Sequence, residues 1–126
     1  MRTDPIPLIV SYLNSCPDVP AGTATGSLLG RESGDTTVYV TQTGGFRLVR
    51  DSVDRADVMY EVYHRERPTA AGLAFTVREY LLEHLPGLLV EGVQVLDTKD
   101  ISAPHYVPDT QSSEHTYEGE IAIFYA

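Results

Sequence analysis

The chain has 126 residues, of which 42% are hydrophobic, a single cysteine and a formal net charge of −9. This length predicts one domain over residues 1–126, and the apolar content is typical of a globular protein rather than a disordered one. The negative charge argues against a protein that wraps nucleic acid, because such binding needs clustered Lys and Arg. One cysteine excludes an intrachain disulfide and a cysteine-rich zinc site. No stretch approaches the ~20 apolar residues of a membrane-spanning helix, and the prolines near the N-terminus argue against a signal peptide.

The first expected element is a short amphipathic helix that ends before Pro17. Asp4-Pro5 is typical of an N-cap followed by a first-turn proline. The apolar positions that follow at helical spacing are Leu8, Ile9, Tyr12, Leu13 and Cys16. Residues 16–35 are rich in Gly, Pro, Ser and Thr, so they predict a long connection with a short extended piece at Ser27–Arg31.

Two strands joined by a long loop are expected next. Thr37–Thr43 is dense in β-branched residues and tyrosine, which favours a strand, and Gly44-Gly45 should end it. Phe46–Asp54 is expected to be a loop. The run Asp57–His64 then places Val58, Tyr60 and Val62 on one face of a second strand, because side chains alternate along a strand.

A helix with one apolar stripe follows Pro68, which suits a first helical turn. Pro86-Gly87 should end this helix, and Leu88–Leu96 should form another strand. The polar run Asp97–Ser113 is expected to be a loop, and His115–Tyr125 alternates cleanly as a closing strand. The core is predicted to hold six residues: Val62, Leu73, Val77, Leu81, Val93 and Ile121.

This order of elements predicts an α+β fold, a two-layer sandwich with helices packed on one face of a four- or five-stranded mixed sheet. The closing strand is apolar on both faces, because Ala122 and Phe124 alternate with Ile121, Ile123 and Tyr125. Such a strand needs cover on both sides, either from the N-terminal helix or from a neighbouring subunit.

The chain offers no recognisable catalytic or metal-binding signature. His105, Asp109 and His115 could converge on a metal, but loop histidines are more often solvated, so no metal site is predicted. Cys16 is interpreted as a structural thiol, and the pair Glu118 and Glu120 as a solvated acidic row. We therefore expect no enzymatic activity and no cofactor.

Several stretches resemble the tail terminator (tail completion) proteins of long-tailed, non-contractile bacteriophages. The resemblance covers nearly the whole chain and rests on patterns of apolar residues. The stretches that carry it are Asp4–Leu13, Ala56–Tyr63 running into Arg67–Ala71, Leu73–Leu85, Gly92–Val95 and the closing strand.

The resemblance implies an α+β subunit that forms a ring, a hexamer, on the head-proximal end of the tail tube. Such a ring ends tube polymerisation and presents a joining surface to the head–tail connector. The implied partners are therefore further copies of the chain, the tail tube protein and the connector. DNA would pass through the ring without sequence-specific binding, no membrane is involved, and assembly takes place in the host cytoplasm before the protein becomes part of the virion tail.

The resemblance assigns no individual interface residues, so the candidates come from physical reasoning. Aromatic residues and arginines dominate interface energies, and the two expected loops Thr43–Asp54 and Asp97–Ser113 hold several of them. The candidates are Phe46, Arg47, Arg50, His105 and Tyr106, together with Phe124 on the closing strand. Phe46 and Tyr106 could instead pack against their own sheet edge. Two other functions stay open: another small neck protein such as a head–tail adaptor, or a small ligand-binding or enzymatic α+β domain.

Overall fold

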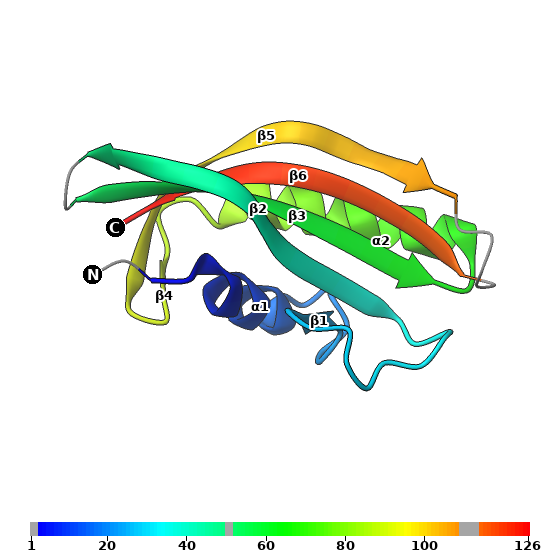
Figure 1. The fold of residues 1–126 in the computed structure, drawn as a ribbon. Helices are drawn as coiled ribbons and strands as arrows, with labels where there is room; N and C mark the ends of the chain where they lie inside the picture. The colour runs from blue at the N-terminus through cyan, green and yellow to red at the C-terminus, as the bar shows by residue number, and fades with distance from the viewer. Residues whose placement is uncertain (1–2, 50–51, 109–113) are drawn as a thin grey trace.

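The computed structural model describes residues 3–49, 52–108 and 114–126 of the chain. Two helices and a short π-helical segment pack against a sheet of six strands (Figure 1). In chain order the elements are α1 (Pro5–Ser15), β1 (Ala24–Thr25), β2 (Thr37–Val49), β3 (Val53–His64), α2 (Arg67–Glu79), η1 (Tyr80–His84), β4 (Leu89–Val90), β5 (Val93–Val107) and β6 (His115–Tyr125). No helix in the described part of the chain is long and apolar enough to cross a bilayer.

The sheet has the strand order β1-β2-β3-β6-β5-β4. Among the strands that the structure describes, only the β1–β2 pair is parallel, so the sheet is mixed, as expected. The α+β class is confirmed, but the prediction of a two-layer sandwich with a four- or five-stranded sheet was wrong in strand number and in shape. The sheet has six strands and curls into a half-barrel around the helices (Figure 1). Two of the six strands are only two residues long, and so short a strand leaves little pattern in the sequence.

Both helices form where the sequence predicts them. Asp4 caps α1, because its carboxylate accepts a hydrogen bond from the Ile6 backbone N–H at 3.0 Å. Pro68 lies in the first turn of α2. The π-helical η1 follows α2 directly, and Thr98 of β5 donates a hydrogen bond to the carbonyl of Leu81 in η1 at 2.7 Å. This bond ties the end of the helix to the sheet.

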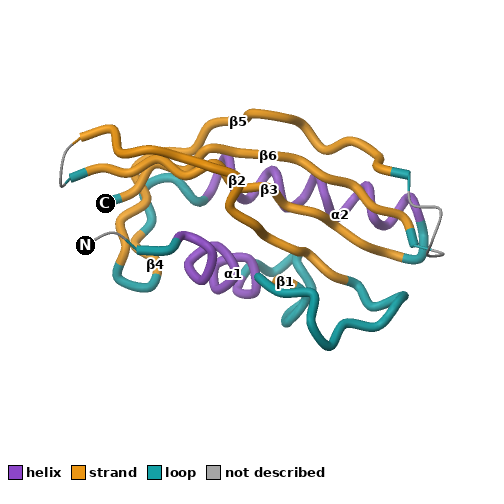
Figure 2. Tube along the Cα trace, in the orientation of Figure 1, coloured by secondary structure: helices purple, strands orange, loops and turns teal. Residues whose placement is uncertain are grey.

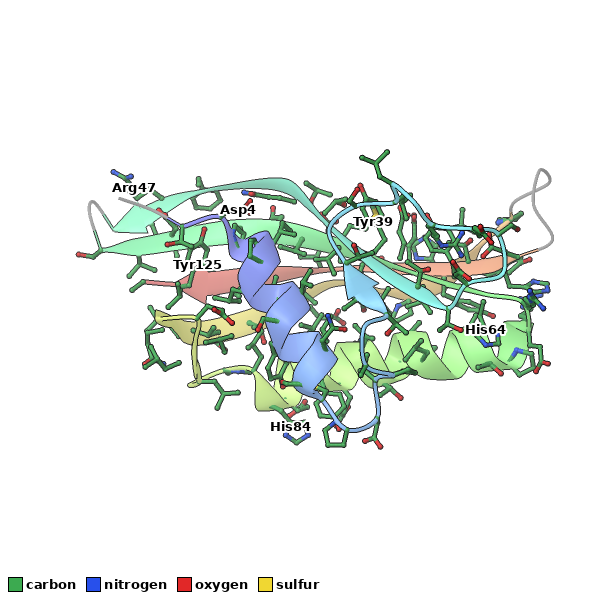
Figure 3. All side chains as sticks on the ribbon, turned by 90° about the horizontal axis from the view of Figure 1, so that it is seen from below. Asp4, Tyr39, Arg47, His64, His84 and Tyr125 are labelled. Atoms are coloured by element: carbon green, nitrogen blue, oxygen red, sulfur yellow. The ribbon has the colours of Figure 1, made fainter. Side chains whose placement is uncertain are left out.

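One hydrophobic core lies between the helices and the concave face of the sheet. When the molecule is seen from below, α1 crosses in front of the sheet and α2 runs along its lower side (Figure 3). The alternating positions Val58, Tyr60 and Val62 are completely buried on that face. All six residues predicted for the core are buried as expected: Val62, Leu73, Val77, Leu81, Val93 and Ile121. Cys16 is also buried, which agrees with its interpretation as a structural thiol.

Three predicted boundaries were wrong. Gly44-Gly45 does not end β2, which continues to Val49 and pairs with β3 as a hairpin (Figure 2). The predicted strand Leu88–Leu96 is instead a second hairpin of β4 and β5, with a two-residue turn at Glu91-Gly92, where both residues have positive φ. Most of the run expected as a loop, 97–107, belongs to β5, and residues 109–113 lie outside the described part.

The connection after α1 also differs from the expectation in one detail. The extended piece is β1 at Ala24–Thr25, which pairs with Val38 and Tyr39 of β2, and Ser27–Arg31 is not a strand. Arg31 anchors the rest of this connection, because its guanidinium forms an ion pair with Glu114 and lies 4.6 Å from the centroid of the Tyr63 ring. The hydrogen bond to Glu114 raises the pKa of Arg31, so its charge is retained.

Candidate functional site

Four of the candidate interface residues lie on strands where the sequence predicted loops, and Phe124 lies on the closing strand as predicted. Phe46 and Arg47 belong to β2, His105 and Tyr106 to β5, and Phe124 to β6. Arg50 lies outside the described residues. Because neighbouring residues of a strand point to opposite faces, these side chains cannot form one site. Each of them is placed by the register of its strand.

Phe46 and Phe124 come together on the face of the sheet that the helices leave uncovered. Phe46 pairs with Arg55 of β3, and Arg55 pairs with Phe124 of β6, so the three residues form one row across three strands. The Arg55 guanidinium lies 5.3 Å from the centroid of the Phe46 ring and 5.8 Å from that of Phe124. We call Phe46, Arg55 and Phe124 the hairpin patch.

The hairpin patch is held together by its own contacts and is partly exposed. The Arg55 guanidinium also forms an ion pair with Asp57 on the same strand, at 2.9 Å, so it is held between the two rings. The side chain of Phe46 is nevertheless 56% exposed. A cation held at an aromatic face gains ~0.5–1 kcal/mol when exposed and more when desolvated, so a partner that covers the patch would strengthen it.

The backbone around Gly44 and Gly45 explains why these glycines were wrongly predicted to end the strand. Gly45 has φ +141°, and an added Cβ would collide with the backbone of Arg55 and come within 2.8 Å of Ala56 Cα. The pairing of β2 with β3 is also irregular between Gln42 and Gly44. The glycines therefore allow a bulge and a close strand approach inside one long strand, and they do not end it.

Further apolar side chains are exposed at the same end of the sheet, which lies to the left in Figure 1. They come from β2, which also carries Phe46, from the first part of β5, which neighbours β6, and from β4, which lies beyond β5. These residues are Leu48, Leu89 and Leu96. Exposed apolar groups gathered at one end of a domain mark an interaction surface more often than scattered ones do.

Arg47 lies on the other face of the same hairpin. It pairs with Asp54 in the β2–β3 ladder, and its Nε lies 3.5 Å from the Asp54 carboxylate. Figure 3 shows Arg47 at the hairpin end, on the side where Asp4 and Tyr125 also lie. Arg47 is therefore not part of the hairpin patch, although it neighbours Phe46 in the sequence.

His105 and Tyr106 occupy the opposite end of the sheet and also point to different faces. His105 lies on the helix-free face, 3.4 Å from the Glu118 carboxylate. Tyr106 packs below the start of α2, where the Arg67 guanidinium lies 4.0 Å from its ring centroid. The Arg67 Nε–H donates a hydrogen bond to Tyr117, which raises the pKa of Arg67. Tyr106 thus packs against its own sheet, the alternative that the sequence left open.

The structure does not bring together the histidines of the alternative metal site. His105 faces Glu118 on the helix-free side, whereas His115 lies on the helix side with its Nδ1 2.9 Å from the Tyr106 hydroxyl. Asp109 lies outside the described residues. Among the residues that the structure describes, no three His, Cys, Asp or Glu side chains form a group that could hold a metal. The absence of enzymatic activity and of a cofactor stays a prediction.

Sequence reasoning missed Arg55, the central residue of the hairpin patch. The signal was present, because the alternation of polar and apolar residues continues backwards from the predicted strand start at Asp57 through Ala56 to Arg55. Extending that strand back to Val53, with a short turn, would have placed Phe46 opposite Arg55. The expectation of a long loop at Phe46–Asp54 prevented this inference.

Comparison with known proteins is informative at the level of fold. No protein-family model and no curated protein sequence matches the chain. A solved structure described as the virion of a native gene transfer agent particle contains a chain with a similar fold, at a TM-score of 0.64. The two chains are 10% identical, and the match covers 94% of this chain and 92% of the other. At this identity the comparison establishes a shared fold over nearly the whole length of both chains.

Proposed function

We propose that this chain is a structural protein of a phage-like virion. The observation that carries the proposal is the fold that it shares, over 94% of its length, with a chain of a gene transfer agent virion. The resemblance of its sequence to tail terminator proteins points to the same class of particle. A role in assembly rather than chemistry also fits the arrangement of its surface, where aromatic and apolar groups gather at one end of the sheet.

Within that class we propose the role of tail terminator. Copies of the chain would form a ring, a hexamer by the resemblance, at the head-proximal end of the tail tube. The ring would end tube polymerisation and offer a joining surface to the head–tail connector. DNA would pass through it without sequence-specific contacts, and neither a cofactor nor catalysis would be involved.

The hairpin patch is the surface that we assign to assembly. Its two aromatic rings are held by a shared arginine, so little conformational entropy would be lost when a partner covers them. Aromatic residues and arginine are also the residue types that contribute most to binding energy at interfaces.

The experiment compares two exposed phenylalanines. Phe46→Ala removes a ring from the hairpin patch, and Phe75→Ala removes one that is 48% exposed on α2. Mass photometry of the purified wild-type protein should show a ring. Phe46→Ala should reduce the ring population about tenfold or more, as for a residue worth over ~1.4 kcal/mol at an interface, while Phe75→Ala should not. Thermal unfolding of both variants should stay close to that of the wild type.

Assembly of particles without the protein distinguishes the two virion roles. Loss of a tail terminator should give tubes of uncontrolled length, whereas loss of a head–tail adaptor should give tubes of normal length that are not joined to heads. The second outcome would assign the chain to the other small neck proteins. A wild-type protein that stays monomeric at all concentrations and leaves tails and heads unaffected when deleted would contradict both roles.

A further inference from the structure

The outer strands of the sheet leave long stretches of backbone without a partner strand. β1 pairs with two residues of β2 and ends opposite Tyr39. β4 pairs with two residues of β5, and the Val95 N–H next to them donates to the Leu88 carbonyl at 2.9 Å. In the described part of the chain no strand pairs with the outer side of β2 after Tyr39 or of β5 after Val95. We call the exposed residues 42–48 the β2 edge, and residues 96–101, of which only Thr98 is buried, the β5 edge.

Both edges carry large apolar side chains that are exposed in a single copy. In the described residues such side chains are exposed on the outer strands β2, β4 and β5 but not on the central strands β3 and β6. On the two edges they are Phe46, Leu48, Leu96 and Ile101, which are 42–56% exposed. A long outer strand with unpaired N–H and C=O groups and apolar side chains is a template for pairing with another chain. The two edges therefore have the properties of an interaction surface.

The directions of the strands fit the two edges to each other. β2, β3, β6 and β5 are neighbours in that order and each pair is antiparallel, so β5 runs opposite to β2. Copies that share one orientation around a ring axis would bring the β2 edge of one copy beside the β5 edge of the next. The two edges would then be antiparallel, and the alternation within each copy would continue from one copy to the next.

Charge and coverage favour this pairing over a pairing of two β2 edges. The sequence of β2 contains no carboxylate, so Asp97 and Asp100 of the β5 edge would face no carboxylate there. Two β2 edges could also pair as an antiparallel two-fold dimer, but Leu96 and Ile101 would then stay exposed. A contact between different edges covers both with one kind of interface, and such heterologous contacts are what a ring requires.

We propose that the β2 edge of one copy pairs with the β5 edge of the next, so that neighbouring copies form one continuous antiparallel sheet. This interface rests on the ring-forming role proposed above and identifies the strands that join the subunits. Phe46 of the hairpin patch lies on the β2 edge, so the strand of the next copy would also cover one side of its ring. The backbone groups of both edges would gain hydrogen-bond partners that the described strands of a single copy do not supply.

Cysteine cross-linking of the full chain tests the pairing. Cys16, the only cysteine in the sequence, is replaced by alanine, and Leu48→Cys and Leu96→Cys are introduced together. Within one copy β3 and β6 separate these positions by three strand spacings, ~14 Å, which a short bis-maleimide does not span. The double variant should give a ladder of covalent multimers on a denaturing gel, and either single variant should give only monomer. Phe75→Cys with Leu96→Cys is the matched control and should give only monomer, because Phe75 is 48% exposed but lies on α2.

A charge on the β5 edge gives a second readout that does not depend on the exact register. Charged side chains on outer strands oppose pairing with another chain. Leu96→Lys should therefore lower the ring population in mass photometry about tenfold or more, whereas Phe75→Lys should not. Leu96 is 46% exposed in a single copy, so the thermal unfolding of Leu96→Lys should stay close to that of the wild type.

The outcomes separate this pairing from the ring itself. Rings that give no ladder with Leu48→Cys and Leu96→Cys would overturn the edge pairing and leave the ring-forming role intact. Rings that persist in Leu96→Lys would do the same. Covalent dimers from Leu48→Cys alone would show that two β2 edges meet, which also overturns the pairing. A wild-type chain that stays monomeric at all concentrations would overturn both the pairing and the ring.

Discussion

Substitution of Gly119 by alanine tests the register of the sheet, because the register determines whether the substitution stabilises or destabilises the protein. Gly119 lies in the interior of β6, directly opposite Tyr60 of β3, and its φ is not in the positive region. Alanine can therefore adopt its backbone conformation. Glycine in a strand interior is usually less stable than alanine by ~0.5–1 kcal/mol, so propensity alone predicts that Gly119→Ala stabilises the protein.

The structure predicts the opposite sign. A Cβ at position 119 would lie 2.5 Å from Cζ of Tyr60 and 3.0 Å from the backbone oxygen of Ser102. Carbon atoms pack best at ~3.5–4.0 Å, so the methyl group would overlap the tyrosine ring by about 1 Å. Tyr60 is completely buried and cannot move aside without displacing the core. Overpacking of this kind destabilises by ~1–3 kcal/mol, which exceeds the gain from propensity.

Urea unfolding followed by circular dichroism measures this free energy. Gly72→Ala is the matched control, because Gly72 lies on the exposed side of α2 with no atom within 4 Å of an added Cβ. That variant should be more stable than the wild type by up to ~1 kcal/mol. In a Tyr60→Val background, Gly119→Ala should no longer destabilise the protein, because the ring that the added methyl group would overlap is absent. If Gly119→Ala stabilises the wild type while Gly72→Ala behaves as expected, the β3–β6 register is incorrect.

Two further predictions concern the core. Leu81→Ala should lower the free energy of unfolding by ~2–5 kcal/mol, because Leu81 is completely buried; a measured loss below ~1 kcal/mol would place the helical stripe on another face. Burial raises the pKa of the Cys16 thiol, so the unfolded chain loses that proton first as the pH rises. The associated stability is present below ~8.5, the ordinary thiol pKa, and is lost as the pH rises through the folded pKa. Urea midpoints from about pH 7 to pH 10 should therefore fall in the wild type and fall less in Cys16→Ala, and equal profiles would contradict the argument.

The sequence predicted the parts of the fold in which burial follows a regular period. Val58, Tyr60 and Val62 alternate because one face of β3 is covered by helices, and all three are completely buried. In α2 the apolar residues likewise recur with the helical period, because one side of the helix is buried. In such segments the spacing of apolar residues shows which face is buried, so the local sequence was sufficient to predict the element and its buried face.

The parts of β2 and β5 that were mistaken for loops lack that pattern for physical reasons. Residues 42–48 at the end of β2 are all exposed, so burial imposes no alternation of apolar and polar residues there, although Phe46 and Leu48 are apolar. In β5 the pairing with β6 is irregular between Val95 and Asp97, between Asp100 and Ser102, and between Ser102 and His105. Each irregularity shifts which residues face the core, so a regular alternation cannot persist. These strands are held by their pairing partners, which a local pattern does not reveal.

The same reasoning decides which residues of the candidate site can act together. A loop allows neighbours such as Phe46 and Arg47 to reach one partner, whereas a strand sends them to opposite faces. The register instead joins Phe46 to Phe124, which is 78 residues away in the sequence, through Arg55. It also separates His105 from Tyr106. An interface on this protein therefore has to be sought along rows across the strands, and the hairpin patch is the row in which aromatic rings, a cation and exposure coincide.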